Sequence, residues 1–190
     1  MQKGLLVKRL LVETIEDFLM RDKVEEITVN DIIEAAGVSR TTFYRYFRDK
    51  YDLINYIYTN KMNDLLRRYD SYKDSYTITY EILKFVSEKR EIFLKILSYT
   101  GQNSFMDFYV KTWIEEDTKM LKDLLGVETL SAEDKYLINY NAIGWSSTMI
   151  RWILDGCQED PKELITILDD LTPKKMLHYY REAAFINGQA

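Results

Sequence analysis

Apolar residues recur at helical spacing along most of the chain. Near the N-terminus, Val7, Leu11, Ile15 and Phe18 follow one another at intervals of three or four, so they share one face of a helix. Residues 50–69 repeat this interval, and no segment alternates apolar and polar residues as a half-buried strand would. The pattern therefore predicts an all-α protein.

Capping signals divide the chain into nine or ten expected helices. Thr28 followed by Asp31 resembles a capping box, so a helix should begin there. Gly37 can adopt a positive φ and end that helix, and Ser39 can cap the next one. The expected helices cover about residues 5–22, a short stretch after Thr28, 40–47, 50–69, 76–88, 91–98, 104–125, 132–155, 161–170 and 174–186.

Composition agrees with this fold class and excludes several others. Only 7 glycines and 2 prolines interrupt the 190 residues, whereas strand-rich folds place these residues in their many turns. Cys157 is the one cysteine and His178 the one histidine, so neither an internal disulfide nor a Cys/His zinc site is expected, and no cofactor is implied. Charge comes too early for a signal peptide, and no apolar run reaches the roughly 20 residues of a membrane span. We therefore expect a soluble, cytoplasmic protein.

Charge is distributed unevenly along the chain. The net charge is −5, yet residues 1–50 hold nine Lys and Arg and nine Asp and Glu. Within residues 39–50, four basic residues accompany a single acidic one. Such a local excess of positive charge suits a surface that faces DNA phosphates. The acidic remainder of the chain would discourage non-specific binding to nucleic acid.

The two short helices around Gly37 predict a helix-turn-helix. A tight turn containing glycine joins them, and the second helix is basic and polar on its outer side. Such a helix lies in the major groove with its N-terminal residues at base edges. An exposed helical hairpin in an unrelated bundle is the alternative at this point. The expected outward residues are Arg40, Thr41, Thr42, Tyr44 and Arg45.

Residues 27–54 resemble the DNA-binding signature of the TetR family of transcriptional regulators. The family has Thr at a helix start, Ala-Gly-Val-Ser at the turn, Tyr-x-x-Phe in the recognition helix and then Lys-x-x-Leu, and all four occur here in that order. The resemblance extends over about residues 8–55. Two positions depart from it: Ile33 stands where Ala is common, and Tyr46 where many members have His.

The resemblance implies a role for each matching residue. Thr28, Tyr46 and Lys50 would contact phosphates, and removing Lys50 would then lower the salt dependence of binding by about one unit. It further implies a DNA-binding domain over residues 1–50 and a ligand-binding and dimerisation domain over residues 51–190. The complete expected DNA-binding set is Thr28, Ser39, Arg40, Thr41, Thr42, Tyr44, Arg45, Tyr46 and Lys50.

The C-terminal half resembles one subclass of this family, which includes regulators of dihydroxyacetone kinase operons. The resemblance rests on Gly144, Trp152, Gly156 and the pair Asp160-Pro161. It implies that the last two family helices form a four-helix interface in a homodimer, which would present two recognition helices to a palindromic operator. The residues expected at this interface are Ile143, Gly144, Ser147, Ile150, Arg151, Leu154, Leu164 and Leu168.

Aromatic residues gather in the middle of the chain at near-helical spacing. They form either a pocket for a small-molecule effector or ordinary core, and core is the more common outcome for such a pattern. The run Glu115-Glu116-Asp117 is expected on a solvated helix face. The candidate pocket residues are Tyr99, Phe105, Phe108, Tyr109, Trp113 and Trp145.

The resemblance to the TetR family implies a homodimeric repressor that a small molecule releases from double-stranded DNA. The alternative keeps the fold but makes the protein a coactivator or a regulator controlled by a protein partner. An enzyme is not expected, because the sequence offers neither a nucleophile with a base nor a set of metal ligands.

Overall fold

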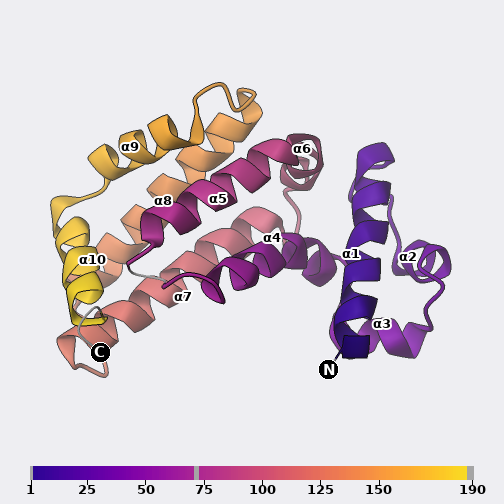
Figure 1. Ribbon diagram of the computed structural model, residues 1–190, viewed down its shortest axis with the longest axis horizontal. Coiled ribbons are helices and arrows are strands. Elements are labelled where there is room, and N and C mark those ends of the chain that lie inside the picture. The colour runs from indigo at the N-terminus through magenta and orange to yellow at the C-terminus, as the bar shows by residue number, and fades with distance from the viewer. Residues whose placement is uncertain (1, 71–72, 188–190) are drawn as a thin grey trace.

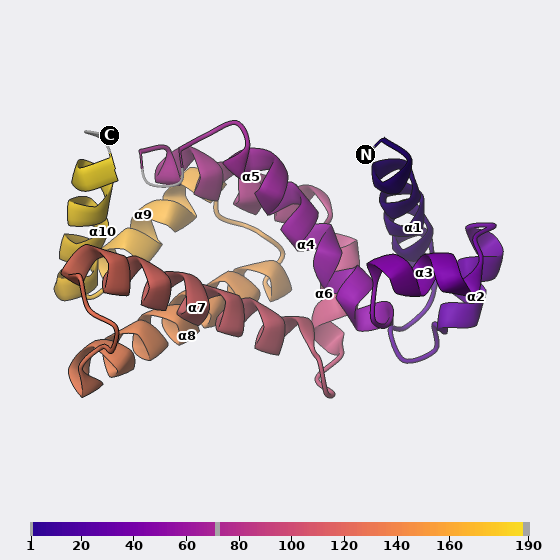
Figure 2. The same ribbon diagram turned by 90° about the horizontal axis from the view of Figure 1, so that it is seen from below.

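The computed structural model describes residues 2–70 and 73–187 of the chain. This part of the chain forms ten helices and no strand, which confirms the all-α prediction. In Figures 1 and 2, α2 and α3 lie at one end of the molecule and α9 and α10 at the other. The helices are α1 (Gln2–Arg21), α2 (Val29–Ala35), α3 (Arg40–Tyr46), α4 (Lys50–Leu66), α5 (Ser75–Glu88), α6 (Arg90–Ser98), α7 (Phe105–Leu125), α8 (Ala132–Leu154), α9 (Pro161–Leu171) and α10 (Lys174–Asn187).

Helices α1, α2 and α3 form a small bundle, which we call the head. Leu11 and Ile15 of α1 are fully buried, together with Ile32 of α2 and Phe43 of α3. The buried stripe of α1 ends on Leu19, whereas Phe18 is only partly buried. The helical spacing in the sequence therefore located the inner face of α1 correctly to within one residue.

Helix α1 of the head packs on the remaining helices, which we call the body. This helix packs against both α4 and α6. Directly before α6, Lys89 Nζ lies 2.7 Å from Glu16 Oε2 of α1, and both side chains are largely shielded from solvent. A displacement of α6 would therefore act directly on α1.

The body contains two groups of buried apolar side chains. The larger group is continuous with the core of the head and includes residues of α4 to α9. A smaller one joins α7, α8 and α10 around Leu121, Ile138 and Met176. Asp117 lies at this second group and is only 4% exposed, so its expected place on a solvated face is corrected. It is buried because α10 packs on this side of α7, where Tyr180 Oη donates to the Asp117 carboxylate.

In the described residues, no helix is both long and apolar enough to cross a lipid bilayer. The same residues contain no group of three His, Cys, Asp or Glu side chains arranged to hold a metal ion.

Candidate nucleic-acid interface

The turn between α2 and α3 has the backbone that its glycine allows. Gly37 adopts a φ of +62°, in the left-handed region. Its N–H donates to Glu34 O at 3.1 Å, and Val38 N–H donates to Ile33 O at 3.1 Å. These bonds satisfy the carbonyls at the end of α2 and direct the chain into α3.

Both helices of the motif are capped by side chains that the sequence identified. Thr28 Oγ1 accepts from Asp31 N, while Asp31 Oδ2 accepts from Thr28 N at 2.9 Å and from the Thr28 hydroxyl. These bonds lower the pKa of Asp31. At the start of α3, Ser39 Oγ accepts from Thr42 N at 3.1 Å and lies 2.8 Å from Thr42 Oγ1. The hydroxyls of Thr28, Ser39 and Thr42 are therefore engaged in hydrogen bonds within the motif.

One side of α3 anchors the helix and the other faces solvent. Phe43 is fully buried and Phe47, directly after the helix, is 3% exposed. Arg40, Thr41, Tyr44 and Arg45 are exposed. The structure thus brings four of the expected DNA-binding residues together on a free basic and polar face. The contacts of these residues with DNA stay predictions.

Arg40 is held in place by a residue that the sequence analysis did not single out. Its Nη1 donates to Asn30 Oδ1 of α2 at 2.9 Å, and its guanidinium lies 5.5 Å from the centre of the Tyr44 ring. Asn30 has no local signal in the sequence, since the contact depends on the angle between α2 and α3.

Tyr46 lies partly buried at the end of α3, beside the first turns of α1. A Cβ added to Gly4 would come within 3.2 Å of the Tyr46 hydroxyl. The Lys8 ammonium lies 5.9 Å from the centre of the Tyr46 ring and 4.7 Å from that of Tyr56. Tyr46 is therefore positioned by α1, and Lys8 and Gly4 are further residues that sequence reasoning missed.

Lys50, at the first position of α4, turns inward. Its Nζ donates to the backbone carbonyls of Val24 at 2.6 Å, Glu25 at 3.2 Å and Ile27 at 2.6 Å. Burial lowers the pKa of Lys50, and the nearby Glu25 carboxylate opposes that change. The neighbouring Arg48 differs, because its side chain is 89% exposed.

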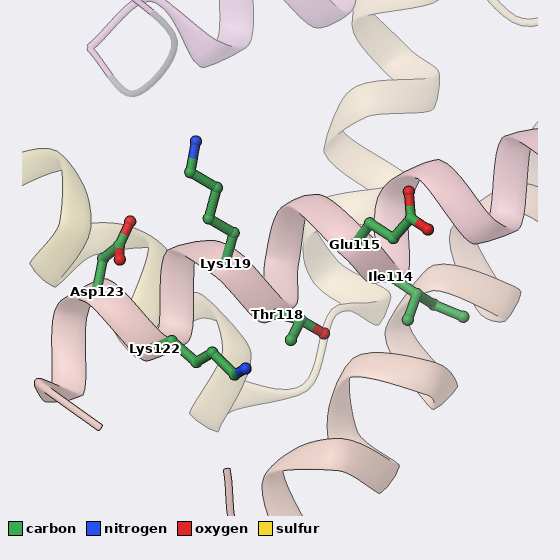
Figure 3. Close-up of a pocket in the computed structure, with 6 residues that line it drawn as sticks. All are labelled: Ile114, Glu115, Thr118, Lys119, Lys122 and Asp123. Atoms are coloured by element: carbon green, nitrogen blue, oxygen red, sulfur yellow. The ribbon is translucent and has the colours of Figure 1, made fainter. Parts of the chain in front are cut away.

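The expected pocket residues contribute to the core of the body. Phe105 and Tyr109 are buried and pack edge-on against Tyr58, while the other four are partly buried. Trp145 Nε1 donates to Thr172 Oγ1 at 2.7 Å. A separate hollow of about 360 Å³ lies on the outer face of α7, and Figure 3 shows that one helix supplies its lining. That lining consists of Ile114, Glu115, Thr118, Lys119, Lys122 and Asp123.

The expected dimer residues fall into two groups by burial. Ile143 and Leu154 of α8 are 51% and 52% exposed, whereas Leu164 and Leu168 of α9 are only 3% and 2% exposed. The two leucines pack inside their own protomer, so we remove them from the expected interface. On α9 the exposed apolar residues are Ile167 and Leu171. The remaining expected residues, Gly144, Ser147 and Arg151, are exposed, and Ile150 is partly buried.

The sequence matches two family descriptions that together span most of the chain. Residues 24–57 match "Bacterial regulatory proteins, tetR family". Residues 73–174, which are more than half of the chain, match "Transcriptional regulator C-terminal region", a family model for the C-terminal part of TetR regulators. The first match includes the whole helix-turn-helix, and the second includes the helices from α5 to α9.

Individual relatives agree with these matches. The HTH-type dhaKLM operon transcriptional activator DhaS of Lactococcus lactis is 23% identical over 113 residues, which are 60% of this chain and 59% of that protein. An HTH-type transcriptional regulator of Staphylococcus aureus is 33% identical over 85 residues, 44% of this chain and 46% of that protein. The matched region thus spans about half of each relative. A solved structure, "Dihydroxyacetone kinase operon activator DhaS", has the same fold, with a TM-score of 0.62 at 20% identity over 93% of this chain and 97% of that one.

Proposed function

Because the chain belongs to the TetR family of bacterial regulatory proteins, a family of DNA-binding transcription regulators rather than enzymes, we propose that it is a homodimer that reads a palindromic operator. The observation that carries this proposal is the outer face of α3. Arg40 and Thr41 are exposed there at the N-terminal end of a capped and anchored helix, where base-reading residues of this motif lie, and Tyr44 is exposed one turn further along.

Within the head we assign the reading and the positioning of DNA to different side chains. Arg40, Thr41 and Tyr44 contact base edges, while Arg45 and Tyr46 contact phosphates on either side. Residues 1–50 form the DNA-binding unit and residues 51–190 the regulatory one. The start of α4 at Lys50 supports this division. The protein acts in the cytoplasm, together with the DNA.

The dimer interface lies on the exposed side of α8 and α9. On α8, Tyr136, Tyr140, Ile143 and Leu154 are each at least half exposed and recur at helical spacing. Apolar side chains in such a row are usually covered by a partner. Ile167 and Leu171 continue this surface on α9. Two copies related by a two-fold axis would then place their α3 helices about one DNA turn apart.

The regulatory mode that we propose is repression, with a small molecule that releases the protein from DNA. The ligand would enter the body near the aromatic residues of α7 and favour a conformation whose half-site spacing no longer fits the operator. The contact between Lys89 and Glu16 supports this coupling, because it joins the junction of α5 and α6 in the body to α1 of the head.

A second candidate is an activator that is controlled by a protein partner. Two observations favour it: the relative from Lactococcus lactis is named an activator, and Phe105 and Tyr109 are already buried among neighbouring rings. A partner pull-down would support this candidate if regulation persisted in the Arg40→Ala variant.

A shift assay with purified protein tests the main proposal. The DNA is the region that flanks the protein's own coding sequence, measured between about 50 and 200 mM salt. We expect binding to a palindrome there that weakens steeply with salt. Protein that binds no site in this DNA in a salt-sensitive way would overturn the proposal.

A further inference from the structure

Lys50 has a complete set of hydrogen-bond partners inside the protein. A lysine ammonium has three N–H donors and no acceptor. Three backbone carbonyls accept from Lys50 Nζ, those of Val24, Glu25 and Ile27, at 2.6, 3.2 and 2.6 Å. A phosphate oxygen could bind this ammonium only in place of one of these carbonyls.

The three carbonyls belong to the loop between α1 and α2. These residues lie outside both helices, so their carbonyls lack the partners that helical carbonyls have. Val24 and Ile27 are 1% and 2% exposed and fix the loop to the core of the head. Lys50 adds a polar attachment on the side of α4.

This loop leads directly into α2 and so places the start of α2 in space. Ile27 is directly followed by Thr28, whose hydroxyl caps α2. Helix α2 in turn carries Asn30, which holds Arg40. Lys50 is the first residue of α4. Its ammonium therefore joins the first helix of the body to the loop that leads into the helix-turn-helix.

We infer that Lys50 is a positioning residue for DNA binding, which acts by holding the loop before α2 against the start of α4 and not by contacting a phosphate. This inference rests on the proposed DNA-reading function. Near the start of α4, the residue that contacts a phosphate is Arg48. Its side chain is 89% exposed, and its guanidinium is 3.7 Å from Asp52.

Three variants distinguish a phosphate contact by Lys50 from its positioning of the loop before α2. Lys50→Met keeps the aliphatic stem and removes all three donors. Lys50→Arg keeps the charge, but its planar fork cannot direct three donors at three converging carbonyls. Arg48→Met is the matched control, because it removes an exposed charge two residues away.

The variants are compared in two measurements on the full chain. The first is the dependence of duplex affinity on salt, measured at 10 °C by fluorescence anisotropy with a random-sequence duplex of 30 base pairs and with any operator identified in the shift assay. The second uses no DNA: the thermal midpoint and the amide hydrogen exchange of residues 24–32.

We expect both Lys50 variants to bind DNA about tenfold more weakly with an unchanged salt slope. Lys50→Met should also lower the thermal midpoint by about 4–8 °C and speed exchange in the loop and in α2. Arg48→Met should lower the salt slope by about one unit and leave the midpoint unchanged.

Two results would overturn the inference. One is a Lys50→Met variant whose salt slope falls by about one unit while its midpoint and exchange match the wild type. The other is a less stable Lys50→Met variant that, fully folded at 10 °C, binds DNA as tightly as the wild type. If the wild type bound no duplex, the proposed function would fail instead, and the exchange data would still decide whether Lys50 holds the loop.

Discussion

Arg40 and Asn30 are joined across the turn of the helix-turn-helix, where Nη1 of the arginine donates to Oδ1 of the asparagine at 2.9 Å. The Tyr44 ring lies on another side of the guanidinium, with its centre 5.5 Å away. A long, exposed side chain is thereby restricted to a small set of conformations before it meets DNA. Such preorganisation reduces the entropy lost on binding and fixes the direction in which Arg40 points.

The first prediction concerns Asn30. Asn30→Ala should reduce discrimination at the base pair that Arg40 reads by about 3- to 10-fold, a part of the roughly 1–3 kcal/mol that a good arginine–base pair provides. Competition binding with single base-pair substitutions along the site measures it. Asn60→Ala, on the exposed side of α4, is the control. Equal base preferences in Asn30→Ala and the wild type would contradict the role of Asn30.

The second prediction concerns the cap of α3. Ser39→Ala leaves Thr42 N–H without its acceptor, so the free energy of unfolding should fall by about 1 kcal/mol. Ser131→Ala is matched to it, because Ser131 caps α8 by accepting from Asp134 N at 3.1 Å. Both variants should lose similar stability in urea unfolding, but only Ser39→Ala should weaken DNA binding. A loss of binding in both would point to general destabilisation.

The third prediction concerns the proposed dimer. Ile143→Glu places a charge in the middle of the exposed α8 row, so it should give monomers at concentrations where the wild type is dimeric. Affinity for a palindrome should then fall by about 100-fold, because the two half-sites are no longer bound together. Light scattering after size-exclusion chromatography reads the first effect and anisotropy the second. Val127→Glu, at a 40% exposed apolar residue outside this row, should change neither.

The fourth prediction concerns pH. Asp117 is 4% exposed and accepts from Tyr180 Oη at 3.0 Å, and Asn141 Nδ2 donates to the same hydroxyl at 3.0 Å. Burial raises the pKa of Asp117 from 3.8 to about 7, and the Tyr180 hydrogen bond opposes that rise. The folded protein therefore holds this proton more tightly than the unfolded chain does. Its stabilising effect is complete below about pH 4 and is lost as the pH rises to about 7.

The Asp117→Asn variant tests whether the wild type loses stability as the pH rises through the pKa of Asp117. Its advantage in unfolding free energy over the wild type should grow between pH 4 and pH 7, by at most about 4 kcal/mol, and stay constant above pH 7. Urea unfolding of both proteins at matched pH values measures the difference. A difference that is the same at pH 5 and pH 8 would contradict the raised pKa.

Local features of the molecule could be predicted from the sequence, and features that depend on helix packing could not. Thr28, Ser39 and Gly37 act within three or four residues of their own position, so their caps and turn follow from residue type and spacing. The partners of Lys50 are 23 to 26 residues away in the chain. No spacing rule relates such positions, and only the packing of α4 against the head brings them together.

Helix α9 illustrates the same limit. Its apolar residues form two neighbouring rows, and the sequence alone does not say which row faces the protomer's own core. Packing against the body buries Leu164 and Leu168 and leaves Ile167 and Leu171 exposed. The residues expected at the interface on α9 therefore belong to the row that faces the protomer's own core, and a dimer interface on α8 and α9 stays a proposal.

The most direct test of sequence-specific DNA reading through α3 is selection of binding sites from a random pool of duplexes by the purified protein. We predict enrichment of an inverted repeat whose half-site centres are about 10 base pairs, or one helical turn, apart. With Arg40→Ala, the preferred base should change or relax at the same position in both half-sites. Selection that enriches no sequence, or an enriched sequence that is identical for the wild type and Arg40→Ala, would contradict the account.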